Sequence, residues 1–139
     1  MKIGITASAF DLLHSGHVLM LQEAKTVCDH LIAALHIDPS VENEAKNKPI
    51  QSIVERYAQI DGVKYVDQVI PYQTESDLID IIQLYRVNIR IIGEEYRYKN
   101  FTGSRMGIET YFNARKHNFS SSNLREKVAN IDISGKPNN

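Results

Sequence analysis

Residues 3–17 of the chain read Ile3-Gly4-Ile5-Thr6-Ala7-Ser8-Ala9-Phe10-Asp11-Leu12-Leu13-His14-Ser15-Gly16-His17. The first four residues form a short apolar run, which is typical of a buried strand. After Gly16, the apolar residues Val18, Leu21 and Ala24 recur at helical spacing, and Cys28 continues the pattern. We therefore predict a strand that passes through a short turn into a helix over residues 16–28.

The rest of the chain repeats this alternation of strand and helix. The predicted strands cover residues 31–35, 65–70, 89–92 and 108–112, and the predicted helices cover residues 52–60, 75–85 and 121–129. The run at 31–35 is apolar throughout, as in a strand that is covered on both faces. We expect Pro71 to stop the third strand and Ser121 or Ser122 to cap the last helix.

Strands that alternate with helices at these spacings predict a parallel sheet with crossover helices. We expect an α/β fold, a single Rossmann-like three-layer domain with a five-stranded parallel sheet and helices on both faces. The domain is expected to cover residues 1–130, before a polar tail over residues 131–139. Ligands of such sheets bind beyond the carboxyl ends of the strands, which here are residues 6–17, 35–48, 71–75 and 93–101.

Composition excludes several classes of protein. The chain has 139 residues, of which 42% are hydrophobic and 24% charged, the usual mix of a globular domain. Its formal net charge of −1 provides no overall positive field for a nucleic acid backbone. No apolar run approaches the roughly 20 residues of a membrane span, and no signal peptide is visible. We therefore expect a cytoplasmic protein that neither inserts into membranes nor binds nucleic acid.

Two histidines, His14 and His17, stand on either side of Gly16 at the predicted change from strand to helix. At the first turn of a helix, this spacing places both imidazoles on one side, beside the free backbone N–H groups and the positive end of the helix dipole. Such a helix end binds anions, and a glycine lets the backbone approach the ligand. The pattern favours a phosphate site. A capping or surface histidine pair and one half of a metal site are the alternatives.

The stretch Phe10-Asp11-Leu12-Leu13-His14-Ser15-Gly16-His17 resembles the HxGH signature of the nucleotidyltransferase superfamily. The likeness is greatest to small cytidylyltransferases, particularly the glycerol-3-phosphate cytidylyltransferases. Four later segments resemble this family in the same order: Lys46-Asn47-Lys48-Pro49-Ile50 with Glu55-Arg56, Lys64-Tyr65-Val66-Asp67-Gln68-Val69, Gly93-Glu94-Glu95-Tyr96, and Arg115 with Ser120-Ser121-Ser122. The resemblance covers about residues 2–129.

The resemblance implies transfer of CMP from CTP to a small phosphorylated alcohol, with glycerol 3-phosphate the first candidate and pyrophosphate the leaving group. One alternative is an adenylyltransferase that uses ATP and a sugar phosphate or flavin nucleotide. A second is a non-catalytic nucleotide-binding module. Mg²⁺ would be carried by the triphosphate, with no metal site on the protein. The resemblance also implies a homodimer with contacts near residues 64–67.

The resemblance also implies a role for individual residues. The catalytic residues would be His14, His17, Lys46 and Arg115. The nucleotide would be bound by Ala9, Phe10, Gly16, Lys48, Gly93, Glu95, Ser120, Ser121 and Ser122, and the acceptor by Asp11, Asp38 and Lys64. One departure concerns the acceptor. Glycerol-phosphate enzymes of the family tend to carry lysines after the third strand to receive the acceptor phosphate, whereas residues 71–85 contain no Lys or Arg and include Glu75, Asp77 and Asp80.

Overall fold

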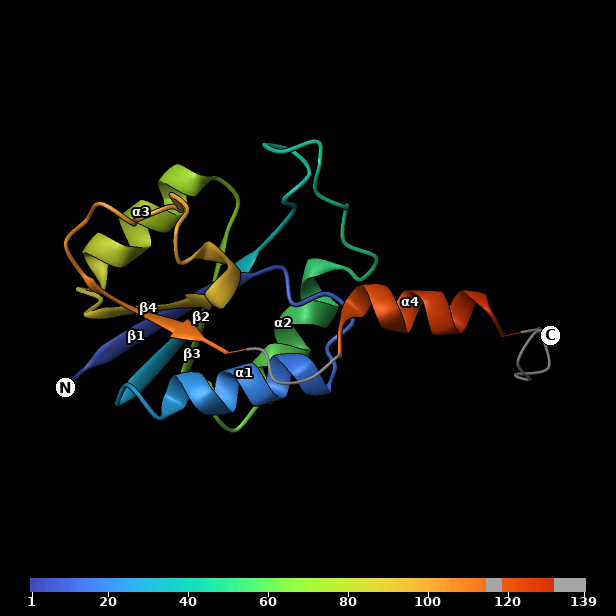
Figure 1. The fold of residues 1–139 in the computed structure, drawn as a ribbon, viewed down its shortest axis with the longest axis horizontal. Coiled ribbons are helices and arrows are strands. Elements are labelled where there is room, and N and C mark those ends of the chain that lie inside the picture. Colours follow the sequence, from blue (N-terminus) through green and yellow to red (C-terminus); the bar gives the residue numbers. More distant parts are fainter. Residues whose placement is uncertain (115–118, 132–139) are drawn as a thin grey trace.

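A parallel sheet forms the middle layer of the protein in a computed structural model, which describes residues 1–114 and 119–131 (Figure 1). The strands of the described part are β1 (Ile3–Ser8), β2 (His30–His36), β3 (Gln68–Tyr72), β4 (Ile89–Gly93) and β5 (Glu109–Asn113). The helices there are α1 (Ser15–Lys25), α2 (Ile53–Asp61), α3 (Glu75–Leu84) and α4 (Ser121–Ala129), with a short 3-10 helix, η1 (Glu94–Tyr96). The strand order is β3-β2-β1-β4-β5, and every pairing is parallel, which confirms the predicted fold class.

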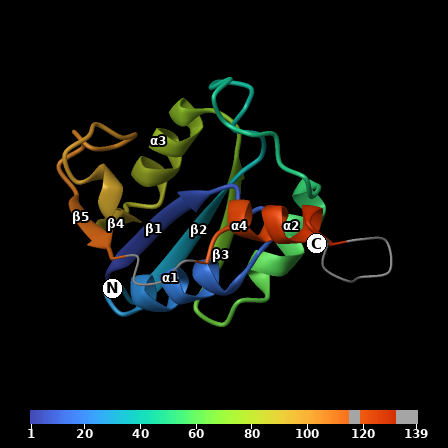
Figure 2. The same ribbon diagram turned by 45° about the vertical axis from the view of Figure 1, so that its right-hand side comes forward.

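Helices cover both faces of the sheet (Figure 2). On one face, Leu21 of α1 and Ile60 of α2 belong to a buried cluster with Leu31. On the other face, Leu78 of α3 belongs to a second cluster with Ile32. Alternate residues of β2 thus enter opposite cores, which explains why residues 31–35 are apolar throughout. The apolar run predicted a strand buried on both faces, and this prediction is confirmed.

The third strand begins and ends later than predicted. β3 runs from Gln68 to Tyr72 and contains Pro71, which we expected to stop the strand. Proline is tolerated here because, among the described strands, β3 is the outermost and pairs with β2 alone, where Pro71 is opposite Leu35. Its missing N–H group removes no hydrogen bond from a second neighbouring strand.

The first helix is shorter than its apolar pattern predicts. α1 ends at Lys25, where the Thr26 hydroxyl donates a hydrogen bond to the Glu23 carbonyl at 2.6 Å. Cys28 therefore lies in the connection to β2 rather than in the helix. It packs against Gly4 of β1, where an added Cβ would lie 2.8 Å from the Cys28 Sγ atom.

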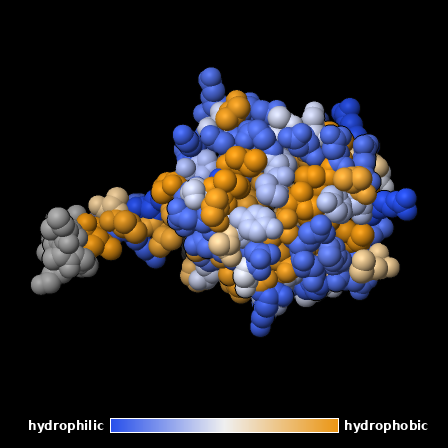
Figure 3. Space-filling view, turned by 180° about the vertical axis from the view of Figure 1, so that it is seen from behind, coloured by the Kyte–Doolittle hydropathy of each residue, from blue (hydrophilic) through white to orange (hydrophobic). Residues whose placement is uncertain are grey.

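The last helix starts as predicted but is capped by another serine. Ser120, rather than Ser121 or Ser122, accepts a hydrogen bond from the Asn123 N–H at 3.0 Å. No residue of α4 is buried, and the helix projects away from the sheet (Figures 1 and 3). Within the described residues, no helix is long and apolar enough to span a bilayer. Of the tail predicted at 131–139, residues 132–139 lie outside the described residues.

Candidate active site

His14 forms the N-cap of α1, at the carboxyl end of β1. Its Nδ1 atom accepts a hydrogen bond from the Gly16 N–H at 2.9 Å. His17 Nδ1 accepts one from the His14 backbone N–H at 3.2 Å, so the two residues form a reciprocal capping box. The two ring centroids lie 4.0 Å apart. The predicted pairing of the imidazoles on one side of the helix is therefore present.

The capping box also determines which ring nitrogen carries the proton. In a neutral imidazole, the nitrogen that accepts a hydrogen bond is unprotonated, so these contacts place the proton on Nε2 in both rings. Burial and the neighbouring His14 ring lower the pKa of His17 to about 4, against the opposing effect of Asp11. His17 is therefore a neutral Nε2–H donor at pH 7. The first turn of α1 contains no acidic residue, so its positive end remains suited to an anion.

The turn between β1 and α1 has a demanding backbone conformation. Phe10 and Leu12 have φ angles of 50° and 51°, in the left-handed region that residues with side chains rarely enter. The Phe10 ring is buried and meets the His17 ring edge-on, with centroids 5.7 Å apart. The Ser8 hydroxyl accepts a hydrogen bond from the Phe10 N–H at 3.2 Å. The structure thus places Phe10 in the core, in contact with His17.

Arg56 of α2 is a buried residue of the site region to which the sequence analysis gave no role. Its guanidinium donates hydrogen bonds to four backbone carbonyls: Ala9 at 3.0 Å, His36 at 2.7 Å, Ile37 at 2.6 Å and Gln51 at 3.1 Å. The side chain thereby joins the turn after β1 to both ends of the loop between β2 and α2. The sequence does contain a signal for the burial of Arg56, because its spacing places it on the same helix face as Ile53 and Ile60.

Asp11 is buried, and both of its carboxylate oxygens are used within the protein. Oδ2 accepts a hydrogen bond from the Ile50 N–H at 2.9 Å, and Oδ1 accepts one from the Gln51 N–H at 3.0 Å. Arg125 of α4 donates to Oδ2 at 2.8 Å. Burial alone would raise the pKa of Asp11, but these contacts hold it below its usual value. Arg125 was not a predicted site residue.

The loop between β2 and α2 carries three predicted site residues. Lys46 and Lys48 are exposed near its tip. Asp38, near its start, accepts hydrogen bonds from the Ser40 hydroxyl at 2.6 Å and from the Ser40 N–H at 3.0 Å. These contacts lower the pKa of Asp38. The loop follows the carboxyl end of β2, and His14 follows the carboxyl end of β1, so the lysine loop and the histidines lie at the same end of the sheet.

Two further predicted segments reach this end of the sheet. Gly93 ends β4, and the Glu95 carboxylate folds back over it, so an added Cβ on Gly93 would lie 2.6 Å from Glu95 Cδ. In α4, the Ser121 hydroxyl donates a hydrogen bond to the Asp11 carbonyl at 2.9 Å, whereas Ser122 is exposed. The predicted catalytic Arg115 lies outside the described residues.

Comparison with known proteins identifies the family. Residues 5–127 match the family described as "Cytidylyltransferase-like". The chain belongs to the cytidylyltransferase-like family. It is 33% identical over 105 residues to "Bifunctional protein HldE" of Caulobacter sp. (strain K31), and 34% identical over 128 residues to the protein of that name in Helicobacter pylori (strain HPAG1). These matches cover 75% and 91% of the chain, but the chain spans only 21% and 27% of those proteins.

Solved structures share the cytidylyltransferase-like fold. The lipopolysaccharide core biosynthesis protein from Thermoplasma volcanium GSS1 matches with a TM-score of 0.66 and 26% identity, over 86% of this chain and 99% of that one. Pantoate-beta-alanine ligase from Francisella tularensis matches with a TM-score of 0.60 and 15% identity, over 96% of this chain and 69% of that one. The second likeness concerns the fold alone.

Lys64 does not join the other predicted site residues of this cytidylyltransferase-like protein. It precedes β3, so it lies at the amino ends of the strands, where its Nζ is 5.2 Å from the centroid of the Tyr65 ring. In a parallel sheet, each connection from a helix into the next strand lies at the amino ends of the strands, whereas the histidines lie at the carboxyl ends. Within one chain, Lys64 therefore does not meet an acceptor that is bound beside His14.

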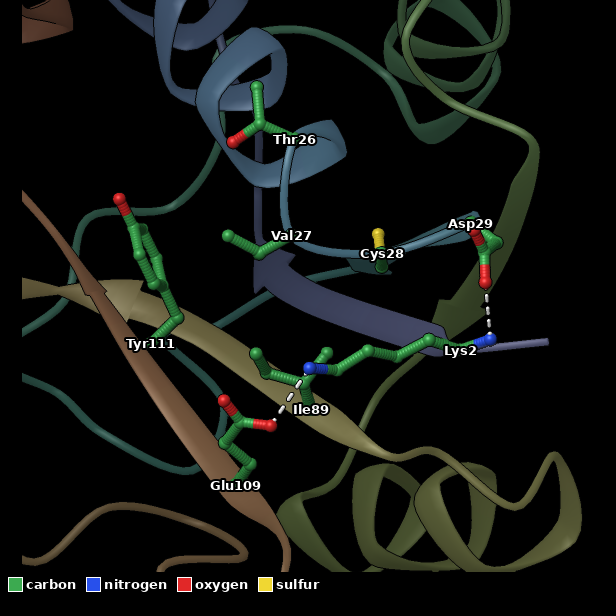
Figure 4. Close-up of a pocket in the computed structure, with 8 residues that line it drawn as sticks. All are labelled: Lys2, Thr26, Val27, Cys28, Asp29, Ile89, Glu109 and Tyr111. Carbon is green, nitrogen blue, oxygen red and sulfur yellow. Dashed lines mark hydrogen bonds and ion pairs between the residues drawn. The ribbon is translucent and has the colours of Figure 1, made fainter.

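Two hollows of the described surface lie at opposite ends of the sheet. One, of about 480 Å³, is lined by Leu13, His14, Ser15, Val18 and Leu19. The other, of about 400 Å³, lies at the amino ends of the strands (Figure 4). There the Lys2 ammonium pairs with Glu109 at 2.9 Å, and the Lys2 backbone N–H donates to Asp29 at 2.7 Å. Of these two hollows, the first is lined by His14 and the second by neither histidine.

Proposed function

We propose that the protein is a nucleotidyltransferase that transfers a nucleoside monophosphate from a nucleoside triphosphate to a small phosphorylated alcohol or sugar. Pyrophosphate is the other product. The observation that carries this proposal is the pair of imidazoles at the N-terminus of α1, whose Nδ1 atoms both accept hydrogen bonds from backbone N–H groups. Membership of the cytidylyltransferase-like family supports the reaction class.

In this reaction, a phosphate oxygen of the acceptor attacks the α-phosphorus of the triphosphate. The bond from the α-phosphorus to the bridging oxygen breaks as the new bond forms, and pyrophosphate leaves with that oxygen. His14 and His17 donate hydrogen bonds from Nε2 to phosphate oxygens on which negative charge increases. Because the pKa of His17 is about 4, this ring acts as a neutral donor at pH 7.

Residues from two other segments complete the proposed site. Lys46 contributes a positive charge to the reacting phosphates from the exposed tip of its loop, and Lys48 is the second lysine there. The N-terminus of α4, capped by Ser120, supplies hydrogen-bond donors to the β- and γ-phosphates. The resemblance assigns Arg115 to the same phosphates.

Mg²⁺ is part of the proposal as an ion that enters with the triphosphate. Among the residues that line the hollow, His14 and Ser15 carry polar side chains, and neither is a carboxylate of the kind that binds Mg²⁺. Among residues 1–114 and 119–131, no group of three His, Cys, Asp or Glu side chains could hold a metal ion. The phosphates of the nucleotide would supply oxygen ligands to the ion, and the ion would neutralise part of their charge.

CTP and glycerol 3-phosphate are the first substrate pair that we propose, because the motifs of the sequence resemble those of glycerol-3-phosphate cytidylyltransferases. Glu95, beside Gly93, would accept a hydrogen bond from the exocyclic amine of the base. Cytosine and adenine both carry such an amine, so this contact suits either nucleotide.

ATP and a sugar phosphate are the second pair. The similar protein from Thermoplasma volcanium is titled a lipopolysaccharide core biosynthesis protein, which favours a sugar as acceptor. Two acidic residues also lie side by side here, Glu42 in the loop after β2 and Glu75 after β3, because the Glu42 carboxylate accepts a hydrogen bond from the Glu75 N–H at 3.0 Å. Carboxylates accept hydrogen bonds from hydroxyl groups and repel a second phosphate, so they suit a polyhydroxyl acceptor.

Pyrophosphate release tests the proposal. The purified protein is incubated with Mg²⁺ and either CTP or ATP, with glycerol 3-phosphate, a panel of sugar phosphates and flavin mononucleotide, and without acceptor. Activity with one pair identifies the substrates. If no pair releases pyrophosphate but one nucleotide raises the melting temperature, the result would indicate a non-catalytic nucleotide-binding module. Sedimentation of the same sample tests the proposed homodimer.

Substitution of the histidines tests their role. His14→Ala and His17→Ala should each lower kcat/KM by about 100-fold or more, the usual effect of losing a donor to a developing oxyanion. The matched control is His30→Ala, because His30 lies at the amino end of β2 and bonds to Gln68 at 2.9 Å. Full activity of His14→Ala in a correctly folded protein would eliminate the proposed role.

A further inference from the structure

Asp11 connects three segments that are far apart in the chain. Its carboxylate accepts hydrogen bonds from the backbone of Ile50 and Gln51, 39 and 40 residues away, and from Arg125, 114 residues away. Only 7% of the residue is exposed, so water cannot readily replace these partners. Both oxygens are already engaged, which leaves Asp11 poorly suited to the acceptor-binding role that the resemblance implies.

The loop arm of this network is the pair of hydrogen bonds from Ile50 and Gln51 to Asp11, at the end of the lysine loop (residues 37–52). At its far end, the loop is held by Asp11 and by the Leu12 N–H, which donates to the Gln51 side chain at 2.7 Å. Residues 41–48, between the two ends, are exposed. Lys46 thus lies in an exposed tip, which contacts α3 through Glu42 and Glu75, and Asp11 helps to hold the end of the loop that leads into α2.

The helix arm of this network joins Asp11 to α4, the helix that would bind the triphosphate. Arg125 and Ser121 attach the first part of α4 to the side chain and carbonyl of Asp11, at 2.8 and 2.9 Å. Because no residue of α4 is buried, apolar packing contributes little to holding this helix. Polar contacts to Asp11 therefore have a large share in its placement.

We propose that Asp11 is a positioning residue that places, through one carboxylate, both the lysine loop and the N-terminus of α4 around the triphosphate. This inference rests on the proposed nucleotidyl transfer. The two arms have different kinetic consequences. Loss of the loop arm misplaces Lys46 and lowers kcat, whereas loss of the helix arm weakens nucleotide binding and raises KM.

Limited proteolysis by trypsin tests the placement without any activity. Lys46 precedes Asn47 and can be cleaved, whereas Lys48 precedes Pro49 and is protected. In Asp11→Asn, cleavage after both Lys46 and Lys127 should accelerate about fivefold or more, because local opening becomes easier. Cleavage after Lys64, at the opposite edge, should keep its rate and serves as the internal control for global unfolding.

Single-arm variants separate the two connections and remain informative if Asp11→Asn does not fold. Gln51→Ala keeps the backbone bonds to Asp11 but removes the bond from the Leu12 N–H at the same end of the loop, so it should accelerate cleavage after Lys46 alone. Arg125→Met removes the bond from α4 to the Asp11 carboxylate and should accelerate cleavage after Lys127 alone. The matched control is Lys2→Met, which breaks the Lys2–Glu109 ion pair at the other end of the sheet and should change neither rate. Wild-type cleavage rates in both single-arm variants would overturn the proposal.

A double-mutant cycle tests the connection to catalysis. Asp11→Asn should lower kcat about tenfold in the wild-type background, but less than about twofold in Lys46→Ala, because residues that act through one another are not additive. The rise in KM for the triphosphate should persist in both backgrounds. An equal loss of kcat in both would overturn the proposal. If the wild type releases no pyrophosphate with any substrate pair, the proposed function fails, and proteolysis still decides the placement.

Discussion

Arg56→Met should destabilise the protein more than any exposed arginine substitution. Only 2% of Arg56 is exposed, and its guanidinium donates to the carbonyls of Ala9, His36, Ile37 and Gln51. Methionine keeps an unbranched apolar side chain but donates no hydrogen bond. The four carbonyls would then lose a partner in a region where water has little access.

The magnitude follows from the contacts. Four hydrogen bonds at a net value of about 1 kcal/mol each give a loss of about 4 kcal/mol. Burial lowers the pKa of the Arg56 guanidinium, against the charges of Asp11 and Asp38, so removing the charge recovers some desolvation energy. The free energy of unfolding should therefore fall by about 3 kcal/mol, out of the 5–15 kcal/mol that is typical of a whole domain.

Urea unfolding monitored by circular dichroism measures this loss. With a slope of about 2 kcal/mol per M, the midpoint should fall by about 1.5 M. Arg86→Met is the matched control, because Arg86 is exposed and the chemical change is the same. A loss below about 1 kcal/mol, or one equal to that of the control, would refute the reasoning by showing that the carbonyls find other donors.

Three further predictions concern single sites. As the pH falls from 6.5 towards 4, the free energy of unfolding of the wild type should fall by up to about 3 kcal/mol more than that of His17→Gln. The reason is that the pKa of His17 is about 4 in the folded chain and 6.5 in the unfolded chain. Urea unfolding at pH 7 and pH 4.5 measures the difference. Gly4→Ala should cost about 1–3 kcal/mol in thermal unfolding, and Cys28→Ala should recover part of it, because the added Cβ meets the Cys28 Sγ; no recovery would place the strain elsewhere. Gly93→Ala should change stability by less than about 0.5 kcal/mol, because it displaces only the flexible Glu95 carboxylate, yet it should reduce the thermal shift that the nucleotide produces, and an unchanged shift would remove Glu95 from the nucleotide site.

Much of the fold could be predicted because it depends on local patterns. An apolar run such as residues 31–35 needs cover on both faces, and this requirement leads directly to a parallel sheet between helices. The errors occurred where a local pattern depends on its neighbours. Pro71 is compatible with a strand only because β3 lies at an edge, and strand order cannot be read from proline itself.

The candidate site divides in the same way. The pairing of His14 and His17 could be predicted because a helix cap involves residues two or three positions apart. The roles predicted for Lys46, Glu95 and the serines of α4 stay predictions, and Arg115 lies outside the described residues. Lys64 could not be excluded from the sequence, since its separation from the histidines depends on which edge of the sheet each connection follows.

By itself, the sequence determined the alternation of strands and helices, the family resemblance and the histidine pair, because periodicity, motifs and helix caps are properties of neighbouring residues. Only the tertiary structure decided what surrounds that pair. Asp11 reaches Arg125 across 114 residues, and Arg56 reaches Ala9 across 47. A buried charge takes the partners that the folded chain brings to it, and no local pattern specifies those partners.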